Sequence, residues 1–226
     1  MFELLMELPL FRGITQARLA EVVGHAKLHF LKYPKGETIV RAGDTCSHMT
    51  FVISGLIRST ATNRNGRFAI GQTLAAPAMI APDFLFGPRT VCPSTIVAID
   101  STSILKISKK DFIKILNADE IFLFNYLNTL SANAQRARAG ILSLTDGSLE
   151  ERLAFWITAL TQPAATDIRL SCKARDLCTI FGVQRSNFDN VALALQDKGI
   201  LTYTPREIII NDRRALTAIL EHSYEQ

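Results

Sequence analysis

The chain has 226 residues and a formal net charge of +4, with 25 lysines and arginines against 21 aspartates and glutamates. Hydrophobic residues make up 48% and charged residues 20% of the sequence, which excludes a disordered chain, and the length fits one large domain or two modest ones. The whole positive excess lies in residues 1–135, so a nucleic-acid function has to be argued from local charges.

The sequence favours a cytoplasmic protein. Its longest uncharged runs, 68–82 and 121–135, contain proline or polar residues and fall short of the ~20 apolar residues of a membrane span. Its first residues include two acids and lack the basic segment of a signal peptide. The spacing of the four cysteines (Cys46, Cys92, Cys172 and Cys178) is not that of a zinc site. We expect reduced thiols and neither a metal nor a cofactor.

Residues 1–108 are expected to form short helices followed by a β domain. The second of these helices has Thr15 as its N-cap candidate. From residue 27 onward, short β-rich runs alternate with turns, among which Asn65-Gly66 is a strong hairpin signal. The expected strands are 27–33, 38–40, 49–53, 56–59, 68–74, 95–99 and 103–107. Strands of this length and spacing indicate a compact barrel or sandwich.

Residues 109–145 have a helical period, and we expect a dimerisation helix here. Apolar and small residues recur at alternating spacings of four and three, which is the heptad pattern of a coiled coil. The alternative is an ordinary helix packed on the core of its own chain. We favour a dimer seam formed by Leu123, Leu127, Leu130, Ala134, Ala137 and Ile141. The turn at Asp146-Gly147 that follows is a hinge candidate.

Residues 146–226 contain the pattern of a helix-turn-helix with a wing. Ser148 and Glu151 have the spacing of a capping box, and residues 162–166 read as a loop. Ser171 is expected to cap a helix that ends at Phe181, and Gly182 occupies a turn that requires positive φ. The second helix is expected over 185–197, the wing over 200–210 and a last helix over 213–223.

The start of the second helix presents polar side chains that suit base recognition. Arginine can bridge O6 and N7 of guanine, and asparagine can do the same for N6 and N7 of adenine. Asp189 would repel phosphate unless it accepts from a cytosine amine or pairs with a neighbouring arginine. The predicted DNA-binding residues are Gln184, Arg185, Ser186, Asn187 and Asn190, with Lys173 and Arg175 as phosphate contacts.

Several segments resemble the CRP/FNR family of bacterial transcription regulators over essentially the whole chain. Tyr33-Pro-Lys-Gly36, Ala42-Gly43-Asp44 and 51–58 resemble the glycine-punctuated strands of the cyclic-nucleotide-binding fold, and 176–188 resembles the family's helix-turn-helix. The resemblance implies an α+β protein. Its parts are an N-terminal double-stranded, jelly-roll-like β-roll (1–108), a dimerisation helix (109–145) and a winged helix-turn-helix (146–226). It also implies a homodimer that binds double-stranded operator DNA, with RNA polymerase as a candidate partner.

The resemblance also places Arg185 where family members commonly carry a base-reading arginine. Ser186 and Asn190 fall where members often carry glutamate and arginine, so we expect an operator different from that of the cAMP regulator. Gln184 replaces the usual serine or threonine cap, which weakens the start of the helix.

The phosphate cassette that cAMP-binding members share is degenerate in this sequence. Ala81-Pro82 stands about where those members carry Gly-Glu, and Cys92-Pro93 or Pro93-Ser94 about where they carry Arg-Ser. Prolines remove amide donors that a phosphate needs. We therefore predict that cAMP is not the effector. The nearby apolar residues fit an altered pocket or plain core, and the candidate effector-binding residues are Met79, Arg89, Thr90 and Ser94.

Other functions have weaker support in the sequence. Haem sensing would need an axial ligand such as His25, His29 or His48, and we favour ordinary histidines. A cupin-type enzyme would need closely spaced histidine ligands, and no HxH arrangement exists, so we expect no enzyme. A cyclic-nucleotide-fold module that acts on a protein partner would leave the helix-turn-helix without a purpose. In a DNA-binding regulator, the β domain would either sense an unidentified small molecule or only support the dimer.

Overall fold

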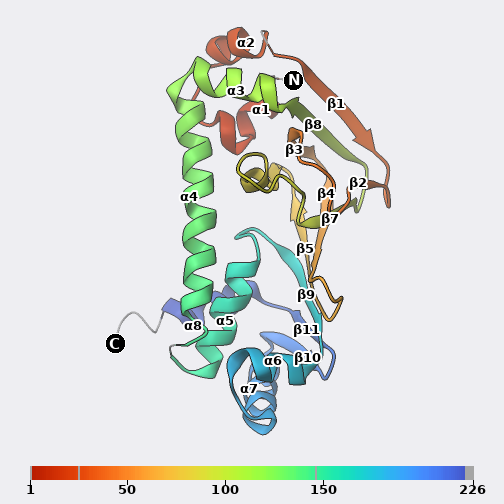
Figure 1. Cartoon of the computed structure of the whole chain (residues 1–226), viewed down its shortest axis with the longest axis vertical. Coiled ribbons are helices and arrows are strands. Elements are labelled where there is room, and N and C mark those ends of the chain that lie inside the picture. The colour runs from red at the N-terminus through yellow and green to blue at the C-terminus, as the bar shows by residue number, and fades with distance from the viewer. Residues whose placement is uncertain (1, 25, 146, 222–226) are drawn as a thin grey trace. The chain divides into compact units, whose positions relative to one another are not determined.

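The computed structural model describes residues 2–24, 26–145 and 147–221. They form two compact units (Figure 1). The first unit contains the described parts of 1–59 and 74–133, and the second unit those of 60–73 and 134–226. Within these described ranges, no helix is both long and apolar enough to cross a bilayer.

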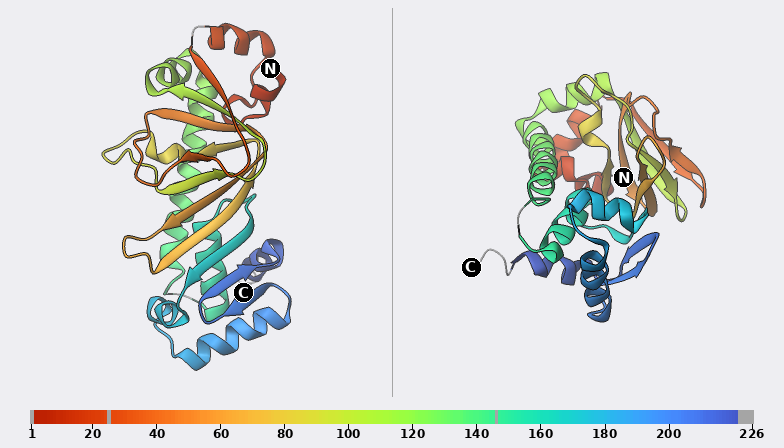
Figure 2. Two further views of the ribbon diagram at one scale, coloured as in Figure 1. Left: turned by 90° about the vertical axis from the view of Figure 1, so that its right-hand side faces the viewer. Right: turned by 60° about the horizontal axis from the view of Figure 1, so that its bottom comes forward.

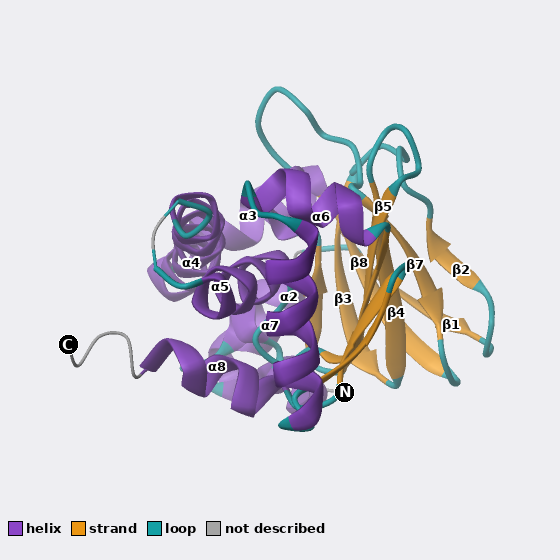
Figure 3. Ribbon diagram, turned by 90° about the horizontal axis from the view of Figure 1, so that it is seen from below, coloured by secondary structure: helices purple, strands orange, loops and turns teal. Residues whose placement is uncertain are grey.

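The β-strands of the N-terminal half are short, as the sequence predicts. Their bounds are β1 (Leu28–Tyr33), β2 (Thr38–Val40), β3 (His48–Ser54), β4 (Leu56–Thr62), β5 (Phe68–Ala75), β6 (Ala78–Ile80), β7 (Ser94–Ala98) and β8 (Thr102–Ser108). In the first unit one sheet has the order β1-β8-β3-β6, and β4, β7 and β2 are neighbours in a second sheet. Figure 3 draws the strands in orange. The predicted β-roll fold is confirmed.

Each of the seven predicted strands appears within a few residues of its predicted position. The Asn65-Gly66 turn is also confirmed, because Gly66 has a φ of 67° and its N–H donates to the carbonyl of Asn63 at 3.0 Å. The sequence did not predict β6, a strand of three residues. It pairs with β3 through Thr50 and Ile80. A strand this short has too few residues to show a period.

The core of the first unit lies between helices and one face of the β1-β8-β3-β6 sheet. Its helices are α1 (Phe2–Glu7), η1 (Pro9–Phe11), α2 (Gln16–Gly24), η2 (Pro82–Phe84), α3 (Lys109–Ala118) and the first part of α4 (Glu120–Leu142). Phe11 joins the two layers, because its ring centroid lies 6.1 Å from that of Phe51 on β3 and 5.4 Å from that of Phe122 on α4. Burying a side chain of this size stabilises a fold by about 1.5–3 kcal/mol.

The segment expected as one helix over 109–145 is two helices in the structure. Asp119 separates α3 from α4 with an extended backbone at φ −156°. Its carboxylate accepts the N–H of Ile121 at 3.0 Å, which satisfies a free donor in the first turn of α4. The predicted heptad pattern begins at Leu123 and therefore lies wholly in α4.

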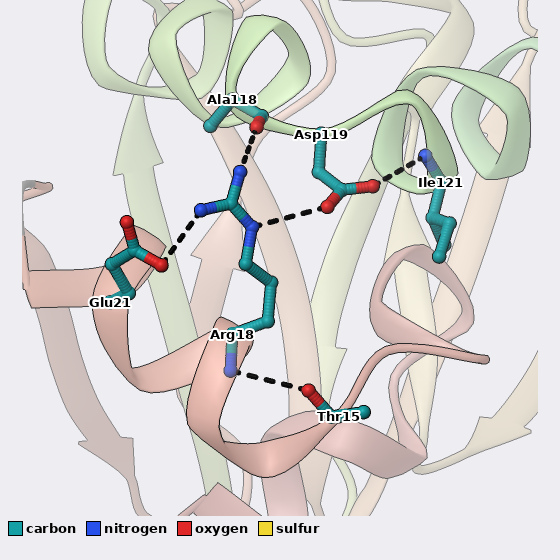
Figure 4. A network of polar contacts seen from close by, with 6 residues as sticks. All are labelled: Thr15, Arg18, Glu21, Ala118, Asp119 and Ile121. Carbon is teal, nitrogen blue, oxygen red and sulfur yellow. Dashed lines mark hydrogen bonds and ion pairs between the residues drawn. The ribbon is translucent and has the colours of Figure 1, made fainter.

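Arg18 on α2 binds the last residue of α3 and Asp119, which follows it (Figure 4). Its Nε lies 3.2 Å from Oδ2 of Asp119, and its Nη2 donates to the carbonyl of Ala118. Its Nη1 lies 2.7 Å from Glu21. The Thr15 hydroxyl accepts the N–H of Arg18 at 3.4 Å, as its predicted capping role requires. One side chain thus joins α2 to the junction between α3 and α4.

The second unit contains helices around a four-stranded portion of sheet. Its elements, drawn from green through blue in Figure 2, are the end of α4, α5 (Leu149–Leu160), β9 (Thr166–Cys172), α6 (Ala174–Phe181), α7 (Arg185–Asp197), β10 (Leu201–Thr204), β11 (Glu207–Ile210) and α8 (Arg213–Glu221). The strand order here is β10-β11-β9-β5. The predicted capping box of Ser148 and Glu151 at α5 is present. Of the predicted hinge, Asp146 lies outside the described residues, and Gly147 has a φ of 81°.

The prediction that Ser171 caps a helix is wrong. Ser171 lies in β9, opposite Ala69 of β5 and Glu207 of β11, and α6 begins two residues after β9 with Lys173 as its N-cap. The sequence of β9 alternates buried Ile168, Leu170 and Cys172 with exposed polar residues. This period of two was present in the sequence and was missed.

Candidate DNA interface

Helices α6 and α7 meet at a tight turn, as predicted. Gly182 ends α6 with a φ of 64°, and its N–H donates to the carbonyl of Cys178. The buried faces of the two helices are apolar, and Phe181 of α6 stacks on Phe188 of α7 with ring centroids 6.2 Å apart. On the other side of Phe181 lies the Trp156 ring of α5, at 5.5 Å. These aromatic contacts fix the crossing of the two helices.

The predicted base-contacting residues occupy the first turns of α7 or its N-cap. Every one of them is exposed: Gln184, Arg185, Ser186, Asn187 and Asn190. Gln184 is the N-cap and makes no side-chain cap hydrogen bond, as its residue type predicts. The start of this helix therefore presents donors and acceptors to solvent.

The predicted phosphate contacts lie on and before α6, and both are exposed. Lys173 is the N-cap of α6, and Arg175 lies 3.6 Å from Asp176. A third basic residue, Arg169 on β9, pairs with Asp167 at 3.1 Å. Exposed ion pairs of this kind contribute little to stability and exchange readily for other partners, so these side chains remain usable for phosphate.

Arg185 has two partners in the second unit. Its Nε lies 2.8 and 2.7 Å from the two carboxylate oxygens of Asp189, one helical turn later. Its Nη2 donates to the hydroxyl of Tyr203 on β10 at 3.2 Å, and that hydroxyl donates to Oδ1 of Asp189. Of the two favourable roles considered for Asp189, the free protein thus shows the pairing with a neighbouring arginine. Tyr203 was not predicted, because no local pattern marks a contact across 18 residues.

The strands β10 and β11 form an antiparallel wing beside α7, with Leu201 opposite Ile210 and Thr204 opposite Glu207. Besides the hydrogen bonds of its hydroxyl with Arg185 and Asp189, Tyr203 makes two further contacts with α7. Its backbone N–H donates to Oε1 of Gln196 at 2.7 Å, and its ring centroid lies 6.0 Å from that of Phe188. The wing and the predicted recognition helix are therefore held as one body.

The segment compared above with the phosphate cassette, residues 76–94, contributes apolar and aromatic groups to the packing of the first unit. Ala81 adopts the left-handed conformation, with φ 46°, and the buried Pro82 follows it. The Tyr126 hydroxyl of α4 donates to the carbonyl of Pro82 at 2.8 Å, and burial raises the pKa of Tyr126 to about 12. Met79 and Phe86 pack against the core cluster, which supports the interpretation of these residues as core.

Arg89, Thr90 and Ser94 have other surroundings. Arg89 is exposed, and the carbonyls of Thr90 and Ser94 accept hydrogen bonds from the Cys46 N–H and the Cys92 thiol. A cavity of about 120 Å³ in this unit is lined instead by residues that include Asp44, Cys46, Ser47, His48, Ala81 and Cys92. None of the four predicted residues lines it.

Two of the histidines considered as haem ligands lie close together on the β1-β8-β3-β6 sheet. The rings of His29 and His48 are 6.4 Å apart, edge to face, and Nδ1 of His48 lies 2.8 Å from the hydroxyl of Ser47. Burial, Lys106 and His29 lower the pKa of His48, so it is neutral at physiological pH. His25 lies outside the described residues.

The predicted dimer seam is an exposed face of α4. Leu123, Leu127 and Ile141 are 38%, 45% and 68% exposed, and the alanines between them are exposed as well. Leu130 differs, because it is partly buried and packs against the core cluster of its own unit. Phe124 adds a further apolar side chain next to the seam, with 58% exposure.

Two family models match the chain. The cyclic nucleotide-binding domain matches residues 30–119, and the Crp-like helix-turn-helix domain matches residues 151–219. No curated protein sequence gives a significant match.

Solved structures of whole regulators are similar over almost the entire chain. The catabolite activator protein of Thermus thermophilus shares 18% identity and a TM-score of 0.52, covering 95% of this chain and 99% of that one. A putative transcriptional regulator of the crp/fnr family from Eubacterium rectale shares 20% identity and a TM-score of 0.50, with the same coverage of 95% and 99%. These two structures support the fold, and the two family models together cover more than half of the chain. The chain therefore joins a cyclic nucleotide-binding-type domain to a Crp-like helix-turn-helix and belongs to the CRP/FNR family of transcription regulators.

Proposed function

We propose that the protein is a homodimeric, sequence-specific DNA-binding regulator that does not respond to cAMP. One observation carries the DNA-binding role: the first turns of α7 expose base-reading side chain types next to the wing. In a winged helix-turn-helix these turns enter the major groove, while the preceding helix and the wing contact the backbone. The exposed Lys173 and Arg175 have the charge that phosphate contacts require.

The exposed apolar stripe of α4 supports the homodimer. A helix face with leucine and isoleucine side chains 38–68% exposed is costly in water, and a second copy of the same helix would bury it. Two symmetric copies would present two α7 helices to half-sites about one helical turn of DNA apart. We accordingly place the protein in the cytoplasm, where operator DNA lies, and assign it no enzymatic activity.

The packing of the segment compared with the phosphate cassette supports the proposal that cAMP is not the effector. Pro82 and Pro93 lack the N–H groups that would surround a phosphate, and the Pro82 carbonyl already accepts from Tyr126. Neither Cys92-Pro93 nor Pro93-Ser94, the two alternatives for the position of the Arg-Ser pair, contains an arginine that would neutralise the anion. An unpaired phosphate buried in such surroundings would be unstable.

The test is selection of duplexes from a randomised pool by the full-length protein, with and without cAMP. We expect enrichment of a palindromic sequence with half-sites ~10 base pairs apart, and the same enrichment without cAMP. Isothermal titration of the protein with cAMP should show no binding. A pool that stays random in both conditions would refute the DNA-binding role. Enrichment that appears only with cAMP would refute the proposal about the ligand.

A further inference from the structure

The hydrogen bonds of Arg185 use one particular edge of its guanidinium group. The planar guanidinium can address a base either through its side edge, formed by Nε and Nη2, or through its end, formed by Nη1 and Nη2. Asp189 occupies Nε, and Tyr203 occupies one hydrogen of Nη2. Among the described residues, Nη1 and the second Nη2 hydrogen make no hydrogen bond. The end of the group is thus left for another molecule.

The three side chains keep their charge states over the physiological pH range. Partial burial opposes ionisation of Asp189, but the hydrogen bonds from Arg185 and Tyr203 outweigh it and hold its pKa below the ordinary value. Burial and the bond to Asp189 raise the pKa of Tyr203 to about 12. The guanidinium is always charged. The hydrogen bonds among these three side chains therefore do not depend on pH in this range.

We propose that Asp189 and Tyr203 are positioning residues that hold Arg185 for end-on, bidentate recognition of one guanine. This inference rests on the DNA-binding function proposed above. A long arginine side chain loses rotamer entropy when it binds, and a side chain that is already ordered loses less. The remaining Nη1 and Nη2 donors match the paired acceptors O6 and N7 of guanine. The other bases lack two adjacent acceptors on the major-groove edge, so a fixed arginine rejects them more strongly than a mobile one.

The exposure of the Arg185–Asp189–Tyr203 hydrogen bonds favours a role in positioning Arg185 over a purely structural role. The Arg185 and Asp189 side chains are 44% and 32% exposed, and an ion pair so accessible to water adds little to folding. Tyr203 is itself held in place by its hydrogen bond to Gln196 and its ring contact with Phe188. It can therefore restrict the motion of the Arg185 side chain. Both oxygens of Asp189 already accept from Arg185, which disfavours direct recognition of cytosine by this carboxylate.

The experiment compares full-length variants on the duplex that the wild type enriches, with each base pair of a half-site replaced in turn. Arg185→Ala identifies the base pair that Arg185 contacts, because in this variant replacing that base pair no longer changes the affinity. The test variants are Asp189→Asn and Tyr203→Phe, which keep the size of the side chains. Asp197→Asn is the matched control, since it removes the same charge from the exposed end of the same helix. Fluorescence anisotropy gives the affinities, and melting curves confirm folding.

At the base pair that Arg185 contacts, we expect the ratio of affinities for the original and the replaced base pair to fall about tenfold in Asp189→Asn and about threefold in Tyr203→Phe. The ratios at the other base pairs should not change. Loss of a negative charge should strengthen binding to an unrelated duplex in both Asp189→Asn and Asp197→Asn, whereas only the former loses discrimination. Unchanged discrimination in both test variants overturns the proposal. A changed preference at a different, cytosine-containing pair in Asp189→Asn also overturns it, because Asp189 would then read a base itself. If the wild type enriches no sequence, the DNA-binding function fails as well.

Discussion

Arg18 and Asp119 lie 101 residues apart in the sequence, yet Nε of one is 3.2 Å from Oδ2 of the other. The contact places a cation of α2 at the point where α3 ends and α4 begins. The N–H of Ile121 and the Arg18 guanidinium stabilise the ionised carboxyl, and together they lower the pKa of Asp119. The junction between α3 and α4 is therefore stabilised by an ion pair.

Asp119→Asn should destabilise the first unit at neutral pH but not in acid. A carboxyl whose pKa is lower in the folded state contributes stability above its unfolded pKa, about 3.9, and loses it as the pH falls through the folded value. Urea unfolding followed by circular dichroism at pH 7 and near pH 3 would check this, with the exposed Glu37→Gln as control. A difference between wild type and variant that persists in acid would contradict the assignment.

Arg185→Ala should weaken binding to the selected operator by about 1–3 kcal/mol and leave weak binding to unrelated DNA nearly intact. Lys173→Ala should instead weaken binding to all sequences and reduce the dependence of log affinity on log salt by about one. Anisotropy titrations at several salt concentrations separate these effects. Equal operator binding by Arg185→Ala and the wild type would remove Arg185 from the set of base readers.

The local features of the fold could be predicted because each depends on residues close in sequence. Gly182 at the turn, the capping box of Ser148 and the Asn65-Gly66 hairpin all follow from backbone requirements of single residue types. The exposed positions of α7 follow from its helical period. The strand β9 had an equally clear period of two but was missed, because its residues were interpreted as the start of a helix.

Contacts between distant residues could not be predicted. The break at Asp119 lies in a segment whose apolar residues suit a continuous helix, and its partner Arg18 is far away in the sequence. The place of Tyr203 beside Arg185 depends on how the wing folds back on α7. The same holds for the ladder between β5 and β9, which joins residues about one hundred positions apart, such as Phe68 and Cys172. The hydrophobic period of a segment indicates whether it forms a helix or a strand, but it does not indicate which other helices or strands it contacts.

Phe68→Ala should shift the tryptophan fluorescence to longer wavelength. Trp156 is the only tryptophan of the sequence, and its ring lies 5.3 Å from Phe68 of the hairpin that pairs with β9. Removal of the Phe68 ring would admit water to the indole. Phe30→Ala is the matched control, because Phe30 is an exposed phenylalanine on β1 of the first unit. The same shift in both variants, or in neither, would mean that the hairpin does not cover Trp156.

Leu127→Asp combined with Ile141→Asp should convert the dimer to monomers that still fold. Both positions are exposed on α4, so the charges are harmless in the monomer but would be buried and unpaired in a seam, at a cost of about 3–5 kcal/mol each. Leu130 is left unchanged, because it also packs on the core of its own unit. Sedimentation velocity would measure the oligomeric state, with Ala132→Asp on the opposite, exposed side of α4 as control. A dimer that persists in the double variant would refute the heptad interpretation.

The thiols of Cys46 and Cys172 should react slowly with iodoacetamide in the folded protein. Burial raises the pKa of both thiols to about 11, so at pH 8 the reactive thiolate is about a thousandth of each population. Cys172 is also shielded in β9, between β5 and β11. Peptide mapping by mass spectrometry after timed labelling would follow each cysteine, with the urea-unfolded protein as the reference for full reactivity. Labelling of Cys172 as fast in the native protein as in urea would show that β9 does not protect it.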